Sequence, residues 1–353
     1  MKTRTLGRTG IRVSPYCLGT MMFGPAGNPD PADCRRIIHR ALDGGINFLD
    51  TADVYGGAGE TERIVGAALV GRRDEVVLAT KFSGPMSDDP NHRGASRRWI
   101  VAAVEGSLRR LGVDHIDLYQ IHHFDADTDM EETLSALTDL VTSGKVRAIG
   151  SSSFLASDIV EAHWISQRRG LAALHTEQPS YSILARGVER EILPVCAKYG
   201  MGVLTWSPLS WGLLTGKYSG SGQTPLSPER QKWGPRHMTD RDKHAAVEKL
   251  LTVADDAGMS LTHMALAFVV AHPGVTSAII GPRTMDQLED LLAGTEHSLS
   301  DDVLDAIDAI APPGADIGVT DIEYRPPAIQ TPALRRPQSA AFFEPCPTRH
   351  GRR

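Results

Sequence analysis

The sequence has few cysteines, and none is placed for a metal site or a disulfide framework. Only four occur in 353 residues, far apart and without a CxxC pair: Cys17, Cys34, Cys196 and Cys346. Scattered thiols of this kind fit neither a structural zinc site nor a small disulfide-bonded secreted domain. A reducing cytoplasm is therefore the expected location.

The sequence also lacks a long apolar run. Residues 1–15 hold no apolar stretch long enough for an export signal. No window reaches the roughly 18 apolar residues that a bilayer span requires. We expect a soluble protein with no membrane partner.

An excess of charge is missing as well. The formal net charge is -6, with 41% hydrophobic and 23% charged residues. These values are typical of a globular chain and exclude general disorder. A mildly acidic protein has no general attraction for nucleic acid, so a small molecule is the expected partner.

A Rossmann dinucleotide fingerprint is also absent. The nearest glycine run, GAGETE over residues 57–62, ends in Glu62, where the GxGxxG pattern requires its last glycine. A nicotinamide cofactor would therefore have to be held in another way.

The sequence does contain a repeated pattern: a short apolar run that predicts a strand, followed by apolar residues at helical spacing. Eight such units favour a closed parallel (β/α)8 TIM barrel over an open doubly wound sheet. The predicted strands cover residues 16–21, 46–49, 76–82, 116–122, 146–150, 174–178, 202–206 and 277–280. We expect a hairpin over residues 2–14 before the barrel. Extra helices are expected over residues 240–257, 261–272 and 301–310.

The domain organisation predicted is one large barrel followed by a tail. Residues 1–311 form the expected barrel domain, a length that suits a substantial core. Residues 312–353 form an extended tail, which is rich in proline and arginine from Arg325 onward. Disorder is the simpler interpretation of the tail, and a docking or oligomer contact is the alternative.

Four polar residues follow three consecutive predicted strands. Asp50 and Tyr55 follow the second strand, Lys81 lies near the end of the third, and His122 ends the fourth. In a TIM barrel the loops at the C-terminal ends of the strands build the active site. Each residue taken alone has a structural interpretation, but the four together indicate one catalytic site.

These motifs resemble those of the aldo-keto reductases, which carry LDTAxxY, an ATK strand and a DLYxxH strand. Asp50, Tyr55, Lys81 and His122 match every position. The likeness extends from Arg4 to about Ala293, including bacterial members and members similar to potassium-channel β-subunits. It implies NADP-dependent carbonyl reduction of an aldehyde or ketone.

The chemistry follows from these residue types. A phenol with an ordinary pKa near ~10 needs a nearby cation to act as an acid at neutral pH. Lys81 supplies that cation, and Asp50 keeps it charged and in position. Neutral His122 would orient the substrate carbonyl while Tyr55 gives its proton.

Two alternatives come from other classes. Asp50, His122, His123 and Asp125 suggest the metal site of a hydrolase. Neighbouring strand residues point to opposite faces, so His122 and His123 cannot both face inward unless the strand has ended; we place His123 in a loop near the substrate. The second alternative is a cofactor-binding regulatory subunit that senses nicotinamide redox state.

The resemblance also implies the residues that bind NADP (NADPH). The implied set is Thr20, Ser151, Ser152, Gln178, Trp206, Ser207, Pro208, Leu209, Ser210, Gly212, Lys217, Gly281, Arg283, Thr284, Gln287 and Asp290. Trp206 would stack on the nicotinamide. The paired N–H donors of the Arg283 guanidinium suit a 2'-phosphate, which favours NADP over NAD. Ser152 and Leu291 stand where the family usually has asparagine.

The substrate pocket and the assembly are less specified. Apolar side chains available to a pocket are Trp99, Phe124, Trp211 and Trp233, and residues 216–235 form a loop that could cover the cofactor. Sugars, steroids, aromatic aldehydes and natural-product ketones all remain open as substrates. We expect a monomer or weak homo-oligomer without a bound metal.

Overall fold

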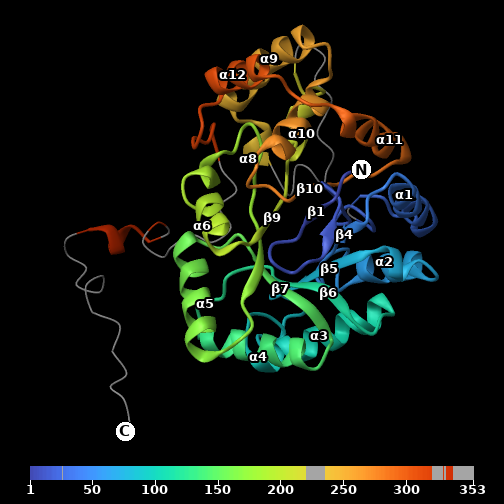
Figure 1. Ribbon diagram of the computed structural model, residues 1–353, viewed down its shortest axis with the longest axis vertical. Coiled ribbons are helices and arrows are strands. Elements are labelled where there is room, and N and C mark those ends of the chain that lie inside the picture. The colour runs from blue at the N-terminus through green and yellow to red at the C-terminus, as the bar shows by residue number, and fades with distance from the viewer. Residues whose placement is uncertain (26, 220–234, 320–328, 330, 337–353) are drawn as a thin grey trace. The chain divides into compact units, whose positions relative to one another are not determined.

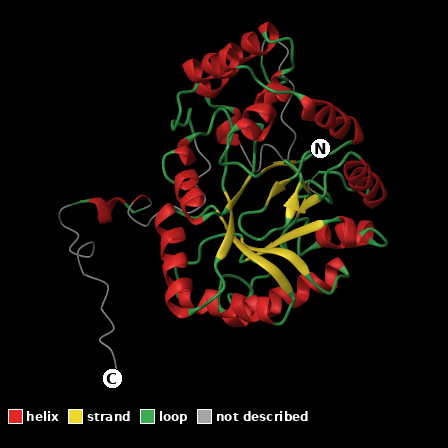
Figure 2. Cartoon of the chain, in the orientation of Figure 1, coloured by secondary structure: helices red, strands yellow, loops and turns green. Residues whose placement is uncertain are grey.

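Eight parallel strands close into a barrel at the centre of the molecule. The computed structural model describes residues 1–25, 27–219, 235–319, 329 and 331–336. The barrel strands pair in chain order, and the last strand closes the ring by pairing with both the first and the seventh. Helices surround them (Figures 1 and 2). The predicted (β/α)8 barrel is confirmed.

The strands and helices follow the predicted alternation. The barrel strands are β3 (Tyr16–Gly19), β4 (Phe48–Asp50), β5 (Val77–Phe82), β6 (Ile116–Ile121), β7 (Val146–Ser152), β8 (Leu174–Gln178), β9 (Gly202–Thr205) and β10 (Ser277–Ile280). The helices are α1 (Pro31–Asp43), α2 (Glu60–Leu69), α3 (Arg97–Leu111), α4 (Met130–Thr142), α5 (Ala156–Arg169), α6 (Ile192–Tyr199), α8 (Pro235–Met238), α9 (Arg241–Asp256), α10 (Leu261–Ala271), α11 (Met285–Ala293) and α12 (Asp301–Ile310).

Local sequence signals define many of the helix ends. The predicted N-cap Ser96 accepts a hydrogen bond from the Trp99 amide, and Ser260 does the same for α10. Gly112 ends α3 with a φ of 66°, a left-handed conformation that glycine adopts without a steric penalty. These caps fix where each helix leaves and rejoins the barrel.

An N-terminal hairpin closes one end of the barrel. Strands β1 (Arg4–Thr5) and β2 (Arg12–Val13) pair antiparallel, as predicted. Leu6 and Val13 are fully buried and pack in one cluster with side chains from the barrel interior: Cys17, Phe48, Ala79, Leu118, Ala148 and Leu204. Apolar packing fills this end, so polar chemistry is confined to the C-terminal ends of the strands.

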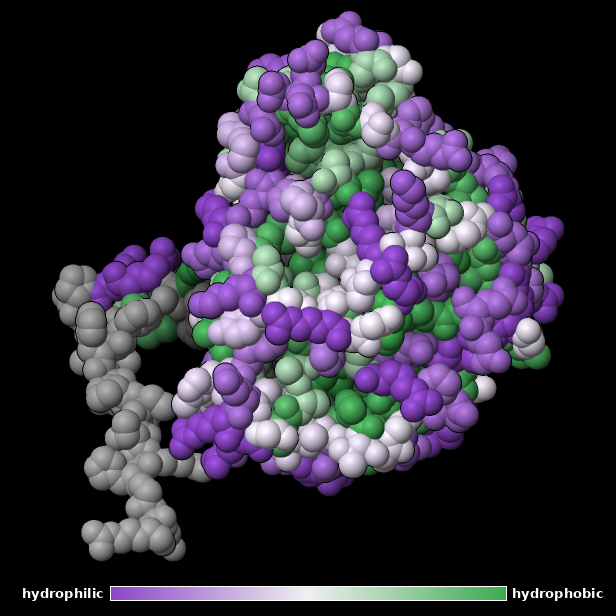
Figure 3. Space-filling model, in the orientation of Figure 1, coloured by the Kyte–Doolittle hydropathy of each residue, from purple (hydrophilic) through white to green (hydrophobic). Residues whose placement is uncertain are grey.

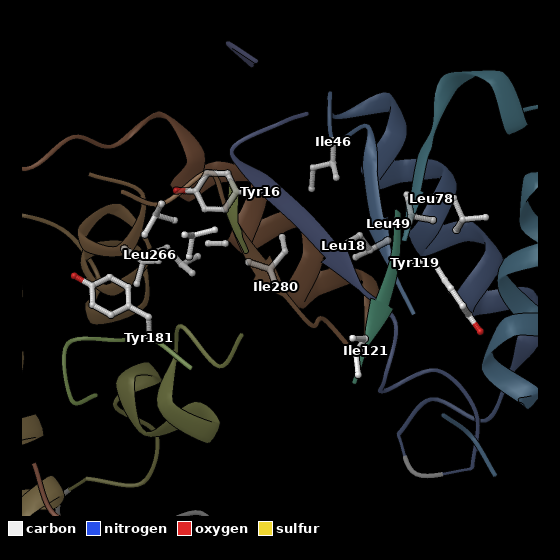
Figure 4. Packing of buried hydrophobic residues seen from close by; sticks show 14 of the residues in the cluster. Tyr16, Leu18, Ile46, Leu49, Leu78, Tyr119, Ile121, Tyr181, Leu266 and Ile280 are labelled. Atoms are coloured by element: carbon white, nitrogen blue, oxygen red, sulfur yellow. The ribbon is translucent and has the colours of Figure 1, made fainter. Parts of the chain in front are cut away.

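A second, larger core lies between the barrel and the helices. Its members include Leu18, Leu49 and Leu78 from neighbouring strands (Figure 4). On the face shown in Figure 3, hydrophilic side chains dominate the surface and apolar ones appear in patches between them. This separation is the burial pattern that the alternating apolar runs predict.

The compact barrel unit extends beyond the predicted boundary at residue 311. It covers Met1–Asp321, and Ile322–Arg353 form a second unit that contains the short 3-10 helix η5 (Pro332–Arg335). Residues 314–317, predicted to lie in the tail, hydrogen-bond to the loop after β8. The compact unit therefore includes the start of the predicted tail.

No single helix among the described residues is long and apolar enough to cross a bilayer. Helices α9 and α10 reach that length and composition only as a pair, which is bent by 91°.

Candidate active site

The ends of β4 and β5 bring three of the four predicted catalytic residues together. The Lys81 ammonium donates hydrogen bonds to the Asp50 carboxylate and, at 3.4 Å, to the Tyr55 hydroxyl. It also donates to the Thr51 carbonyl at 3.0 Å. Thr20 Oγ1 donates to the Asp50 carbonyl at 3.0 Å. The carboxylate, ammonium and phenol thus form one connected group.

The charge on Lys81 is stabilised although the side chain is fully buried. Burial by itself lowers the pKa of an amine, but the Asp50 carboxylate and Tyr55 outweigh it and raise the pKa of Lys81 above its usual range. A fixed positive charge therefore lies beside the Tyr55 hydroxyl.

His122 joins this group through its ring. Its centroid lies 5.6 Å from that of Tyr55, with the planes at 80°. Burial, together with Lys81 and His123, holds the pKa of His122 well below its usual range. The imidazole is consequently neutral at physiological pH, the state needed to orient a carbonyl.

His123 lies in the loop after β6, as predicted, because the strand ends at Ile121. Strand alternation therefore does not apply to the two histidines. Their rings stack at 4.4 Å with the planes at 11°. Among the described residues, no group of three or more His, Cys, Asp or Glu side chains is arranged to hold a metal ion.

Two buried amides support Asp50, and sequence reasoning missed one of them. Gln120 and Gln178 donate to Asp50 Oδ2 at 3.1 and 2.9 Å, and Gln178 also donates to Gln120 Oε1 at 3.3 Å. Gln178 was expected at the nicotinamide carboxamide, yet its own amide nitrogen is directed at Asp50. A glutamine within the apolar run IDLYQI was the available signal for Gln120.

The two predicted serines at the end of β7 bond to neighbouring protein groups. Ser151 donates to the Glu177 carboxyl at 2.5 Å, and Ser152 donates to the Gln178 carbonyl at 3.0 Å. Sequence reasoning did not single out Glu177. Burial raises its pKa to about 7, so a neutral or singly charged carboxyl lies directly behind Ser151.

The segment after β9 holds six predicted cofactor residues, of which Ser207 and Ser210 have positive φ. Trp206, Ser207 and Leu209 are partly exposed, whereas Pro208, Ser210 and Gly212 are buried. In the described chain, every non-glycine residue with positive φ lies in a segment that follows a barrel strand: Ala58, Ser83, Ser153 and Ser207 in loops, and Ser210 and Trp211 in the 3-10 helix η3 (Ser210–Thr215). Such strain typically concentrates at functional sites. Lys217 is exposed, with its ammonium 5.0 Å from the Tyr218 ring.

The segment after β10 holds the backbone of Arg283 from both sides. The Arg283 amide donates to Gln287 Oε1 at 2.8 Å, and its carbonyl accepts from Asn28 Nδ2 at 2.8 Å. Thr284 caps α11 by accepting from the Gln287 amide. Asn28, from the loop after β3, was missed because its partner is far away in sequence.

Two further predicted residues flank this segment. Gly281 is exposed, and a Cβ atom added there would meet nothing within 4 Å. Asp290, expected at the adenine, lies with its carboxylate 3.1 Å from His263 Nε2.

The predicted aromatic residues have separate neighbours. Trp99 is buried and stacks with His92 at 5.2 Å, Phe124 meets Phe154 edge-on, and Trp211 stacks with the His237 ring. Trp233 and most of the predicted 216–235 loop lie outside the described residues.

Comparison with known proteins agrees with this arrangement. Residues 15–312 match the Aldo/keto reductase family. The chain is 42% identical to the uncharacterized oxidoreductase YrpG of Bacillus subtilis, covering 90% of this chain and 98% of that protein. It is 35% identical to a probable voltage-gated potassium channel subunit beta of Oryza sativa, over 88% and 96%. It is 34% identical to norsolorinic acid reductase stcV of Emericella nidulans, over 86% and 79%. The chain therefore belongs to the aldo/keto reductase family.

Proposed function

We propose that this protein uses NADPH to reduce an aldehyde or ketone carbonyl to an alcohol, with Tyr55 as the general acid. One observation carries the proposal: the buried Lys81 ammonium contacts both the Asp50 carboxylate and the Tyr55 hydroxyl. Opposite charge near a phenol favours its ionised form. Tyr55 is thus placed to release a proton at neutral pH.

The other residues of the group have complementary roles. Asp50 anchors the ammonium, and Gln120 and Gln178 hold its second oxygen. Neutral His122 can donate a hydrogen bond to the substrate oxygen that Tyr55 protonates. Bound NADPH supplies the hydride. The reverse reaction uses the same groups, with Tyr55 accepting the proton.

The residues present fit a nicotinamide dinucleotide. Trp206 is partly exposed at the end of β9 and offers a flat surface for the nicotinamide ring. Ser151, Ser152 and Gln178 would contact the carboxamide, for which their hydrogen bonds must rearrange. The pyrophosphate would lie at the loop over residues 207–212, with Thr20 and Lys217 completing the set.

The adenosine end would lie along the segment from Gly281 to Asp290. Asn28 and Gln287 fix the backbone of Arg283, which leaves its guanidinium to meet a 2'-phosphate. Open space beside Gly281 suits the close approach of a ligand. Thr284, Gln287 and Asp290 are the other proposed contacts.

Removing the Tyr55 hydroxyl tests the acid assignment. Tyr55→Phe should lower kcat by about 100-fold or more, the order expected from loss of general acid catalysis. NADPH binding, followed by fluorescence titration, should be unchanged because Tyr55 acts on the substrate. Wild-type turnover in the variant would refute the assignment.

Replacing Arg283 tests the choice of cofactor. Arg283→Ala should weaken NADPH binding by about 1.5–3 kcal/mol, because a charge-assisted hydrogen bond is lost. NADH has no 2'-phosphate and should bind as before. Equal losses for the two cofactors would remove the basis for the preference.

A regulatory subunit is the second candidate, favoured by the 35% identity to a probable channel subunit. A panel of aldehydes and ketones discriminates the two functions, because a pure binding protein would not oxidise NADPH over many turnovers. The buried free thiols of Cys17, Cys34 and Cys196 agree with the proposed cytoplasmic location. A monomer or weak homo-oligomer is the proposed assembly.

A further inference from the structure

The hydrogen-bond ladder between β5 and β6 ends at His122, the first of the two histidines. The strands pair in parallel up to Phe82 and Ile121, and the His122 amide makes the last ladder bond, to the Phe82 carbonyl at 2.8 Å. Figure 1 shows the two strands side by side. Beyond this point the strand backbones no longer pair.

Ser83 replaces the ladder with its side chain. Its φ is 93°, a conformation that costs energy for any residue except glycine, and its carbonyl accepts a hydrogen bond from the Gly94 amide at 2.9 Å. Its Oγ donates to the His123 carbonyl at 3.0 Å and accepts from the His123 amide at 3.1 Å. One hydroxyl therefore satisfies both backbone groups of His123.

The two Ser83 hydrogen bonds matter because, in the described part of the chain, no hydrogen bond fixes the Nδ1 atom of His122. Its Nδ1 is buried and has no partner among the described residues. The ring is held instead by stacking on His123 and by its edge contact with Tyr55. The His122 orientation thus depends on where His123 is held.

We propose that Ser83 is a positioning residue, whose hydroxyl fixes the His123 backbone so that the stacked His123 ring aims His122 at the substrate carbonyl. This inference rests on the proposed carbonyl reduction. It also predicts a change in the protein without substrate. If the Ser83 hydroxyl is removed, the His122 ring is no longer held in place and becomes less buried. The groups that face His122 are Lys81, Tyr55 and His123.

The first test compares Ser83→Ala with wild type in steady-state kinetics. We expect kcat/KM for the carbonyl to fall about 10- to 100-fold, the scale expected when a reacting group is displaced by about 1 Å. The NADPH dissociation constant should not change, because Ser83 is not one of the proposed cofactor contacts. Unchanged kcat/KM would overturn the inference.

The second test needs no turnover. The imidazole pKa of His122 is measured by NMR in wild type, Ser83→Ala and Ser83→Gly. In the two variants the ring should be less buried, so its pKa should rise toward about 6.5. Their kcat/KM should then decrease as the pH is lowered through that pKa. A low pKa retained in both variants would contradict the proposal.

Two variants separate the hydroxyl from backbone strain. Ser83→Gly removes the hydroxyl and relaxes the positive φ, so it should resemble Ser83→Ala if the hydrogen bonds matter. Ser153→Ala is the matched control, because Ser153 also has positive φ but its buried Oγ has no hydrogen-bond partner in the part of the chain that the structure describes. Wild-type kinetics are expected. If Ser83→Gly behaves as wild type, the hydroxyl is not the positioning group.

If the wild type itself turns over no carbonyl, the proposed function fails. The NMR measurement of the His122 pKa still decides the role of Ser83.

Discussion

At the scale of single residues, the site depends on buried polar groups whose protonation the barrel controls. Glu177 is fully buried on β8, where its carboxyl accepts hydrogen bonds from Ser151 Oγ and the Phe154 amide. Burial raises its pKa from near 4.5 to about 7. The folded protein therefore holds this proton more tightly than the unfolded chain does.

That difference predicts a pH-dependent effect of Glu177→Gln. In the wild type, the protonated Glu177 carboxyl contributes to the free energy of unfolding. This contribution is complete below pH 4.5 and is lost as the pH rises through 7. Between pH 5 and pH 8 the loss is about 2–3 kcal/mol. Glutamine does not ionise, so the free energy of unfolding of the variant relative to wild type should rise by that amount.

Urea unfolding at the two pH values measures this effect. Glu161→Gln, at an exposed position on α5, should show the same difference from wild type at both pH values. An equal offset for Glu177→Gln at pH 5 and pH 8 would show that Glu177 is already ionised in the folded protein.

Sequence reasoning placed the polar residues at strand ends, but it did not predict the contacts between residues far apart in the chain. Asp50, Tyr55, Lys81 and His122 stand out because polar side chains there interrupt apolar runs. Gln178 and Asp50 are separated by 128 positions, and Asn28 and Arg283 by 255. Only the closed barrel brings such pairs together.

At the scale of elements, packing between helices fixes a residue that local propensity would not select. Gly66 lies inside α2, where glycine weakens a helix by about 0.5–1 kcal/mol relative to alanine. A Cβ atom there would lie 2.4 Å from the carbonyl oxygen of Leu111, the last residue of α3. The close approach of α2 and α3 therefore requires glycine.

Gly66→Ala should consequently destabilise the protein. Overpacking against fixed backbone typically costs about 1–3 kcal/mol, which exceeds the gain in helix propensity. Gly281→Ala is the control, because a Cβ atom there would meet nothing within 4 Å. That variant should be neutral or more stable by up to about 1 kcal/mol. Denaturant unfolding distinguishes them, and an unchanged or higher free energy of unfolding for Gly66→Ala would show that α2 can shift.

The elements themselves were largely predictable, and their ends less so. The apolar runs and helical spacing located all eight barrel strands. The predicted strand over residues 16–21 stops at Gly19, because a turn bond from the Phe23 amide to the Thr20 carbonyl follows it. The closing register, in which Ala278 pairs with Tyr16, joins the two ends of the barrel and leaves no local pattern.

At the scale of the whole molecule, an ionic cluster around the buried Arg186 holds the end of the compact unit on the barrel. Arg186, in the loop after β8, donates to Glu189 and to Asp308 of α12. It also donates to the Ala311 carbonyl at 2.7 Å. The Glu189 carboxylate then accepts from the Gly314 amide. One guanidinium thus joins a barrel loop, the last helix and the chain beyond it.

Removing this guanidinium should loosen the end of the compact unit as well as destabilise the fold. Arg186→Ala leaves Glu189 buried without its cation, and breaking such a pair typically costs about 3–5 kcal/mol. The amides of Gly314 and Ile317, which bond to Glu189 and to the Leu184 carbonyl, should exchange hydrogen faster. Arg97→Ala removes exposed ion pairs with Glu132 and Asp139 and a hydrogen bond to Ser135 Oγ, so it should cost about 1 kcal/mol and leave those amides protected. Unchanged exchange at Gly314 in Arg186→Ala would mean that the apolar contacts of α12 hold this segment in place without the ionic cluster.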